Sequence, residues 1–207
     1  MHTYMYVGCS DRECHLVSQG MNIEFRFAGW FEKIRGDDAS IHNTYMACTT
    51  IGKIARSNCR KFLVRTPIVG HRYSEDDQGL VLLEEVNVYV GEILRCDGVG
   101  KRQWKTVGQS EGSDDSPAAP ETQFLKCIDP SKNKLCISLG HPGKFSPIYD
   151  LNAGDDNPSN CVYQLGDLLK EESSFPMSVR LAFGWMPKLP IIPRKFQDIM
   201  QFTWNYG

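Results

Sequence analysis

A short motif that occurs twice constrains this chain more than any other feature of its sequence. The segment 23–31 contains the pattern I-x-F-x-x-x-G-x-F, and the segment 137–145 contains I-x-L-x-x-x-G-x-F. Their glycines, Gly29 and Gly143, lie 114 residues apart (143 − 29). The unit that is repeated is too small to bury its own apolar face well, so the repeat predicts two similar units that pack together.

The repeat continues beyond the glycines. At the same offset, the segment 51–54 aligns with the segment 165–168, and each lies in a predicted short helix. At an offset that is one residue longer, the pair Val64-Arg65 aligns with Val179-Arg180, at the ends of two predicted strands. Each half therefore reads as a strand, a Gly-x-Phe segment, a polar loop, a short helix and a second strand. The alternative is coincidence, because I-x-F and G-x-F are common patterns.

Alternation of apolar and polar residues predicts most of the remaining elements. We expect Gly29 to allow backbone angles that other residues resist, with Trp30 and Phe31 covering the end of the sheet. The predicted strands span residues 4–7, 21–27, 61–64, 79–94, 102–107, 124–128, 134–139, 175–183 and 196–204. The predicted helices span residues 50–56, capped by Thr49, and 163–170, and the predicted turns span residues 35–38, 97–100 and 129–133.

These elements predict a mainly β protein, in which two pseudo-symmetric β-rich halves with one short helix each pack as one domain. The 207 residues, of which 41% are hydrophobic, suffice for a full core. The halves are residues 1–107 and 123–207. Ser, Gly, Asp, Glu, Pro and Ala make up most of the segment between them, residues 108–122, so we expect a mobile linker there.

The chain resembles the CABIT domain, the cysteine-containing all-β module of the Themis family of signalling adaptors. The resemblance covers most of the chain and rests on the segments LKCID (125–129), ISLGHPGKF (137–145), YQLGDLLK (163–170) and FPMSVRL (175–181), with weaker first-half counterparts IEFRFAGWF and KFLVR. Cys9 looks like the first-half partner of Cys127. Leu139-Gly140 stands where the family often has Leu-Pro. The core motif residues by this resemblance are Cys127, Ile137, Leu139, Gly143, Phe145, Gly29 and Phe31.

The resemblance implies an intracellular signalling adaptor that acts by protein binding, without enzymatic activity and without a cofactor. The implied partners are Src-homology tyrosine phosphatases and growth-factor-receptor adaptors, and the implied location is the cytoplasm, with the nucleus as a second compartment. We expect a monomer. The formal net charge of −2 gives no overall attraction to nucleic acid, and no apolar run reaches the roughly 20 residues of a membrane-spanning helix.

Candidate partner-binding residues are a cysteine, two basic clusters and a proline-rich segment. Basic side chains can bind phosphotyrosine, phospholipid or an acidic protein surface through charge-assisted hydrogen bonds, although such clusters are more often solvated faces. The segment Pro190-x-x-Pro193 resembles a Src-homology-3 ligand, or is a plain connector. The candidates are Cys127, Lys53, Arg56, Arg60, Lys101, Arg102, Pro190, Pro193 and Lys195, and the clusters also include Lys61, Arg65, Arg95 and Lys105.

Cys127 has two possible roles. In the strand LKCID it alternates with apolar neighbours, as a small buried hydrophobe does, while a reactive thiol would need exposure and nearby positive charge. We predict no metal site, because Cys9, Cys14 and His15 lack a second pair of ligands. We expect free thiols. Two other classes of function stay open: a self-assembling coat or shell subunit, and a cysteine-dependent enzyme.

Overall fold

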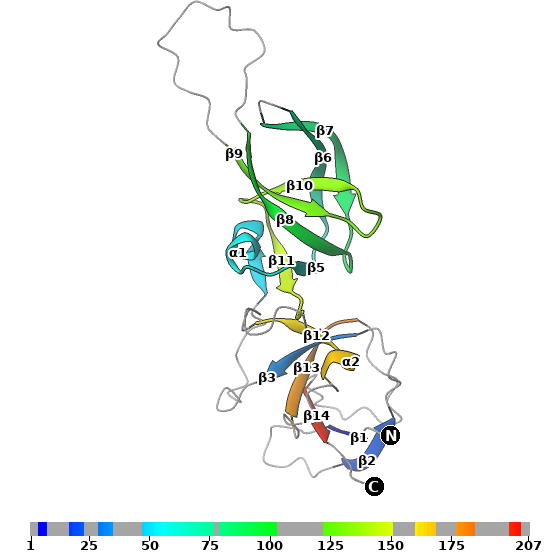
Figure 1. Cartoon of the computed structure of the whole chain (residues 1–207). Coiled ribbons are helices and arrows are strands. Elements are labelled where there is room, and N and C mark those ends of the chain that lie inside the picture. The colour runs from blue at the N-terminus through cyan, green and yellow to red at the C-terminus, as the bar shows by residue number, and fades with distance from the viewer. Residues whose placement is uncertain are drawn as a thin grey trace, which may run out of the picture. The chain divides into compact units, whose positions relative to one another are not determined.

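The computed structural model describes residues 4–7, 17–22, 29–34, 47–76, 79–102, 122–150, 160–168, 177–184 and 199–203. The predicted mainly β class is confirmed, because these residues form two antiparallel sheets and only two short helices. The chain divides into two compact units (Figure 1). Unit 1 comprises Met1–Met46, Leu151–Gly154 and Ser159–Gly207, and unit 2 comprises Ala47–Asp150 and Asp155–Pro158.

Unit 1 contains a six-stranded sheet in the order β12-β3-β13-β14-β1-β2. Phe31 of β3 and Val179 of β13 are fully buried in it, and Lys33 of β3 lies over the ring of Tyr163 in β12, with Nζ 4.4 Å from the ring centroid. Its elements are β1 (Tyr4–Val7), β2 (Val17–Asn22), β3 (Trp30–Ile34), β12 (Val162–Gln164), α2 (Leu165–Leu168), β13 (Met177–Phe183) and β14 (Ile199–Thr203).

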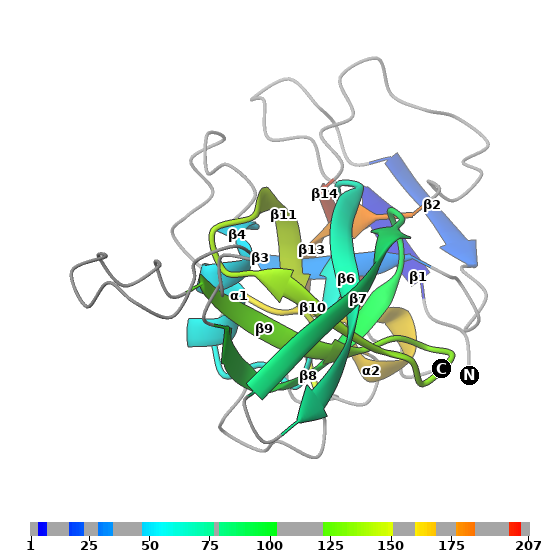
Figure 2. The ribbon, with the colours of Figure 1, turned by 90° about the horizontal axis from the view of Figure 1, so that it is seen from above.

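Unit 2 contains an eight-stranded sheet in the order β4-β11-β5-β8-β9-β10-β6-β7. Figure 2 shows β6 and β7 running side by side as a hairpin, as their antiparallel pairing requires. The elements are β4 (Cys48–Thr50), α1 (Ile51–Arg56), β5 (Lys61–Val64), β6 (Ile68–Asp76), β7 (Gly79–Val88), β8 (Ile93–Arg102), β9 (Thr122–Ile128), β10 (Lys134–Ser138) and β11 (Pro142–Pro147).

The six strands of unit 1 match the first six strands of unit 2. In both sheets the strand with the repeated motif, β3 or β11, lies between the two strands that flank a helix, β12 and β13 or β4 and β5. The next three strands, β14, β1 and β2, then match β8, β9 and β10. Phe31 and Phe145, the last residues of the repeated motif, are both fully buried in the matched strands β3 and β11. The hairpin β6–β7 has no counterpart among the described residues of unit 1. The topology therefore agrees with the repeat read from the sequence.

The strand registers refine the alignment of the two copies. Phe145 lies opposite Val64, and Phe31 lies opposite Leu181, so Val64 is equivalent to Leu181, two residues beyond the predicted Val179. The same comparison extends to the neighbouring strands, from β5 through β8 to β9 in unit 2 and from β13 through β14 to β1 in unit 1. By this comparison, Met5 is the equivalent of Cys127. The expected equivalent, Cys9, lies outside the described residues.

The compact units differ from the predicted halves, because each unit takes strands from both. The elements β4, α1 and β5 come from the first half, yet β4 and β5 pair with β11 of the second half. Conversely, β12 and β13 pair with β3 of the first half. Because the two copies are similar, the repeat alone does not specify whether β3 and β11 each pair with strands of their own half or of the other half. The linker prediction for residues 108–122 falls, apart from Thr122, outside the described residues.

Glycines account for two differences from the predicted elements. The predicted strand 79–94 is two strands, β7 and β8, joined by a turn in which Gly91 has a φ of 93°. The predicted turn 97–100 lies within β8, where Gly98, with a φ of 98°, occupies an irregularity between Cys96 and Val99. A glycine pair therefore marked a bulge in a continuing strand, where we expected the strand to end.

The helices begin later than predicted, because each follows directly on a short strand. Thr50 is the N-cap of α1, and its hydroxyl accepts a hydrogen bond from the backbone N–H of Lys53 at 3.3 Å, in place of the predicted Thr49. The predicted helix 163–170 is α2, which starts at Leu165 after β12. Of the predicted strand 21–27, only its first two residues are described, at the end of β2. Trp30 and Phe31, which we expected to cover the end of the sheet, lie within the strand β3. The strands β3, β4, β6, β11 and β12 were missed.

Candidate functional site

Cys127 is a core residue of unit 2. Its side chain is fully buried in β9, and its thiol donates a weak hydrogen bond to the carbonyl oxygen of Leu125, with Sγ 3.8 Å from that oxygen. Burial raises the pKa of this thiol. A side chain in this position cannot contact a partner directly, so Cys127 does not belong among the partner-binding residues. The reading of Cys127 as a small buried hydrophobe agrees with its position.

The other motif residues of unit 2 also build its core. Ile137 and Phe145 are fully buried, Leu139 packs against the same cluster, and the ring of Phe145 meets the ring of Phe62 edge to face at a centroid distance of 6.0 Å. A methyl group on Gly143 would lie 2.5 Å from Cζ of Phe145. Gly143 does not have a positive φ, so the ring, and not the backbone, is what requires a glycine there. These residues are architecture.

The structure brings the two predicted basic clusters together. Lys61, the first residue of β5, lies directly opposite Arg95 of β8, and both side chains are exposed. Arg60 precedes Lys61 and is also exposed, and its carbonyl oxygen accepts a hydrogen bond from the N–H of Cys96 at 2.9 Å. We call Arg60, Lys61 and Arg95 the basic site. Lys53 and Arg56, both exposed, lie on the preceding helix α1.

The basic site has little compensating negative charge. Nη1 of Arg60 lies 3.8 Å from Oδ2 of Asp150, and 59% of the Arg60 side chain stays exposed, so this is a weak surface ion pair. Within the described part of the chain, neither Lys61 nor Arg95 forms an ion pair. Two like charges directly opposite each other on paired strands destabilise the sheet. One described carboxylate therefore pairs with the three cations of the site.

The remaining partner-binding candidates lie elsewhere. Lys101 is six residues from Arg95 along β8, which is about 20 Å at the usual rise of a strand. Arg102 ends the same strand, and its side chain is outside the described part. Arg65 donates from Nη1 to Oγ of Ser146 at 3.2 Å, which ties it to β11. Pro190, Pro193, Lys195 and Lys105 lie outside the described residues.

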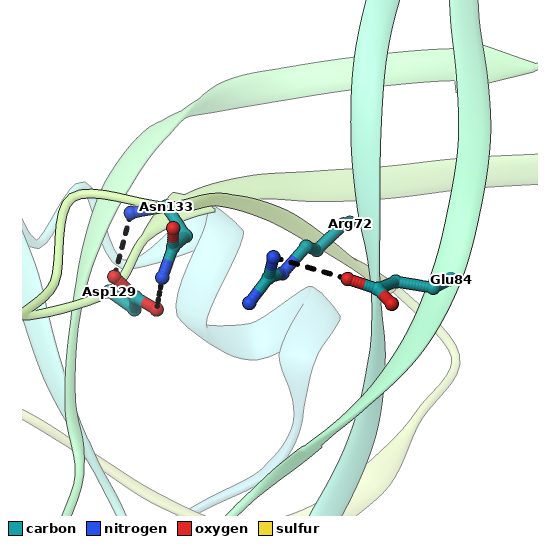
Figure 3. Close-up of polar contacts among 4 residues, drawn as sticks. All are labelled: Arg72, Glu84, Asp129 and Asn133. Carbon is teal, nitrogen blue, oxygen red and sulfur yellow. Dashed lines mark hydrogen bonds and ion pairs between the residues drawn. The ribbon is translucent and has the colours of Figure 1, made fainter.

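The hairpin β6–β7 presents apolar side chains that sequence reasoning did not select. Val69, Val81 and Leu83 are 41%, 37% and 62% exposed, and β7 pairs only with β6 among the described strands. Nη1 of Arg72 lies 3.1 Å from Oε1 of Glu84 across this hairpin (Figure 3). The run of apolar residues 80–83 falls within the predicted strand 79–94, and nothing in it shows that the strand lies at the end of a sheet.

The described parts of the chain hold no group of three or more His, Cys, Asp or Glu side chains arranged to bind a metal ion. The considered ligands Cys9, Cys14 and His15 are outside these parts. No helix among the described residues has the length and apolar character needed to cross a membrane. Comparison with protein-family models, with curated proteins and with solved structures finds no match to this chain.

Proposed function

We propose that this chain is a non-enzymatic signalling adaptor module that binds a phosphorylated segment of a partner protein at the basic site. The observation that carries the proposal is the pair Lys61 and Arg95, two exposed cations directly opposite each other, neither of them in an ion pair within the described part of the chain. Like charges directly opposite each other destabilise a sheet. An anionic ligand removes this cost and adds charge-assisted hydrogen bonds.

The repeated topology supports the proposal, because it separates what the architecture needs from what unit 2 alone has. With Val64 equivalent to Leu181, Lys61 is equivalent to Ser178, and Arg95 is equivalent to Gln201. Ser178 and Gln201 lie opposite each other as Lys61 and Arg95 do, and neither carries a charge. The shared fold therefore does not require cations at these positions, which favours a role in binding.

The resemblance supplies the class of partner. A CABIT-like adaptor of the cytoplasm would bind Src-homology tyrosine phosphatases or growth-factor-receptor adaptors, and phosphotyrosine is the anion that such complexes offer. The arginine guanidinium matches phosphate with two parallel hydrogen bonds, and Arg60 and Arg95 both offer this geometry. The burial of Cys127, with its raised pKa, supports a binding function over thiol chemistry at that residue.

The test is calorimetric titration with an acidic peptide carrying one phosphotyrosine and with its unphosphorylated form. Lys61→Glu and Arg95→Glu are each expected to weaken binding of the phosphorylated form about 10- to 100-fold, since a hydrogen bond to a charged group contributes about 1.5–3 kcal/mol. Lys101→Glu is the matched control, because at about 20 Å it lies beyond the screening length of about 8 Å at physiological salt.

A stability measurement separates lost binding from lost folding. Lys61→Glu places a carboxylate opposite Arg95, so the free energy of unfolding should stay constant or rise by about 0.2–1 kcal/mol while binding falls. Equal binding by the wild type, Lys61→Glu and Arg95→Glu would refute the proposal. So would binding confined to vesicles of anionic phospholipid, which would reassign the site to a membrane surface.

A second candidate function is self-assembly, as in a coat or shell subunit. The exposed Val81 and Leu83 on the terminal strand β7 favour it, because an apolar strand at the end of a sheet can pair with the same strand of another copy. Sedimentation at increasing concentration tests it. Assemblies that Leu83→Lys disperses would support self-assembly, and a monomer at every concentration would exclude this route.

A further inference from the structure

Directly beside the basic site lie two thiols from different strands. Cys59 precedes Arg60 in the segment that follows α1, and Cys96 follows Arg95 in β8. The hydrogen bond from the N–H of Cys96 to the carbonyl oxygen of Arg60, 2.9 Å long, ties the two segments together at this point. Cys59 belongs to the core cluster of unit 2 and Cys96 packs against that cluster, so the two thiols are close enough to interact. The two sulfur atoms are therefore neighbours.

We propose that Cys59 and Cys96 are a peroxide-sensitive thiol pair that hydrogen peroxide converts into an intramolecular disulfide. The pair lies at the surface end of a row of cysteines: Cys96 is partly exposed and Cys59 is 6% exposed, whereas Cys127, directly opposite Cys96, is fully buried. The residues that flank Cys59, Asn58 and Arg60, are exposed, and Cys96 is partly exposed, so the pair lies next to the surface of unit 2. The inference does not depend on the proposed function.

Cys59 is the thiol that reacts first. The interaction with the Cys96 thiol lowers the pKa of Cys59 against the effect of burial. The pKa of Cys96 is raised, first by the same interaction and then by burial. The thiolate is the nucleophile in thiol oxidation. Cys96 then acts as the resolving thiol.

The chemistry is balanced by peroxide alone. The Cys59 thiolate attacks one peroxide oxygen, so an S–O bond forms, the O–O bond breaks, and the leaving hydroxide takes up a proton to become water. The sulfur of Cys96 then attacks the sulfenic acid of Cys59, so the S–S bond forms and the S–O bond breaks. The second hydroxide leaves with the proton of Cys96 as water. The two thiols lose two electrons, and peroxide is reduced to two water molecules.

The test treats the whole protein with hydrogen peroxide, blocks the remaining thiols with N-ethylmaleimide, and maps tryptic peptides by mass spectrometry without reduction. The three relevant cysteines fall on separate peptides: residues 57–60 (SNCR), 96–101 (CDGVGK) and 127–132 (CIDPSK). We expect the first two peptides to be linked and the third to carry the blocking group. Linkage of 96–101 to 127–132, or oxidation of Cys59 to a sulfinic acid without any link, would overturn the inference.

Two further measurements keep the test independent of folding defects in variants. The oxidised wild type should melt at a higher temperature than the reduced protein, and dithiothreitol should reverse the shift, because the disulfide closes a long loop between the two residues. In Cys59→Ser, Cys96 should stay unlinked after oxidation. If Cys96 became linked to Cys127 in that variant as fast as it becomes linked in the wild type, Cys59 would not be the partner of Cys96.

Discussion

Replacing Gly143 with alanine tests the packing argument for the repeated Gly-x-Phe motif. The new Cβ would lie 2.5 Å and 2.9 Å from Cζ and Cε2 of the Phe145 ring, and 3.1 Å from Oγ1 of Thr66. Carbon atoms in contact normally lie about 3.5–4.0 Å apart, so the ring must move by about 1 Å. Phe145 is fully buried against Phe62, which leaves the ring no open side.

The expected cost is that of overpacking a filled core, about 1–3 kcal/mol. An ordinary Gly→Ala substitution lowers the entropy of the unfolded chain and gains about 0.4–1 kcal/mol, which offsets part of this cost. Gly140→Ala is the matched control, because its nearest neighbour, Oγ of Ser138, would lie 3.9 Å from the new Cβ, an ordinary contact. Gly140→Ala should therefore be neutral or slightly stabilising.

Urea unfolding followed by circular dichroism measures both variants. The cost of Gly143→Ala should shrink when Phe145 is replaced by leucine, because the two ring atoms that meet the new methyl group are then absent. The double-mutant cycle isolates this coupling. If Gly143→Ala costs no more than Gly140→Ala, or costs the same with leucine at position 145, then the ring is not the reason for the glycine.

Three other predictions concern unit 2. Burial raises the pKa of Tyr73 to about 12, whereas an unfolded tyrosine has a pKa of about 10. The free energy of unfolding should therefore fall as the pH rises from 10 to 12, and Tyr73→Phe should lack this fall in urea titrations. Asp129→Ala removes two hydrogen bonds of 2.8 Å from the turn in Figure 3 and should lower the free energy of unfolding by about 1–2 kcal/mol in the same assay. An unchanged free energy of unfolding would contradict this prediction and would mean that water replaces the carboxylate. A fragment of residues 47–150 contains every element of unit 2 and should give dispersed amide resonances, whereas 123–207 should not; the reverse result would contradict the exchange of strands.

Local sequence patterns predicted what local interactions determine. The strand Lys61–Val64 has the bounds read from its apolar run, and the turn at residues 129–133 forms as its proline and asparagine indicate. Both helices occur in the predicted places. The missed strand β6 contains Gly70, His71 and Arg72, whose polarity hides it, and its pairing with β7 and β10 supplies the stability that its composition lacks.

The pairing of strands that are distant in the sequence could not be predicted from the sequence patterns. Each half contains a strand with the Gly-x-Phe motif and a helix-strand segment that could pair within that half, and the repeat contains no signal for the observed pairing across the halves. The basic site was visible as two separate clusters, but only the register of β5 with β8 places Lys61 opposite Arg95. The pair Cys59 and Cys96 was invisible for the same reason, since these residues belong to segments that meet only through that register.

Two copies of one topology within a single chain allow architecture and function to be told apart without any other sequence. Phe31 and Phe145 occupy equivalent strands, are both phenylalanine and are both fully buried, as expected where the fold itself makes the demand. Lys61 is equivalent to the uncharged Ser178, so the fold does not demand its charge. The hairpin β6–β7 is present in unit 2 and has no described counterpart in unit 1. Since a destabilising pair of cations and an added hairpin with exposed apolar residues both occur in unit 2, this unit is where binding partners should be sought first.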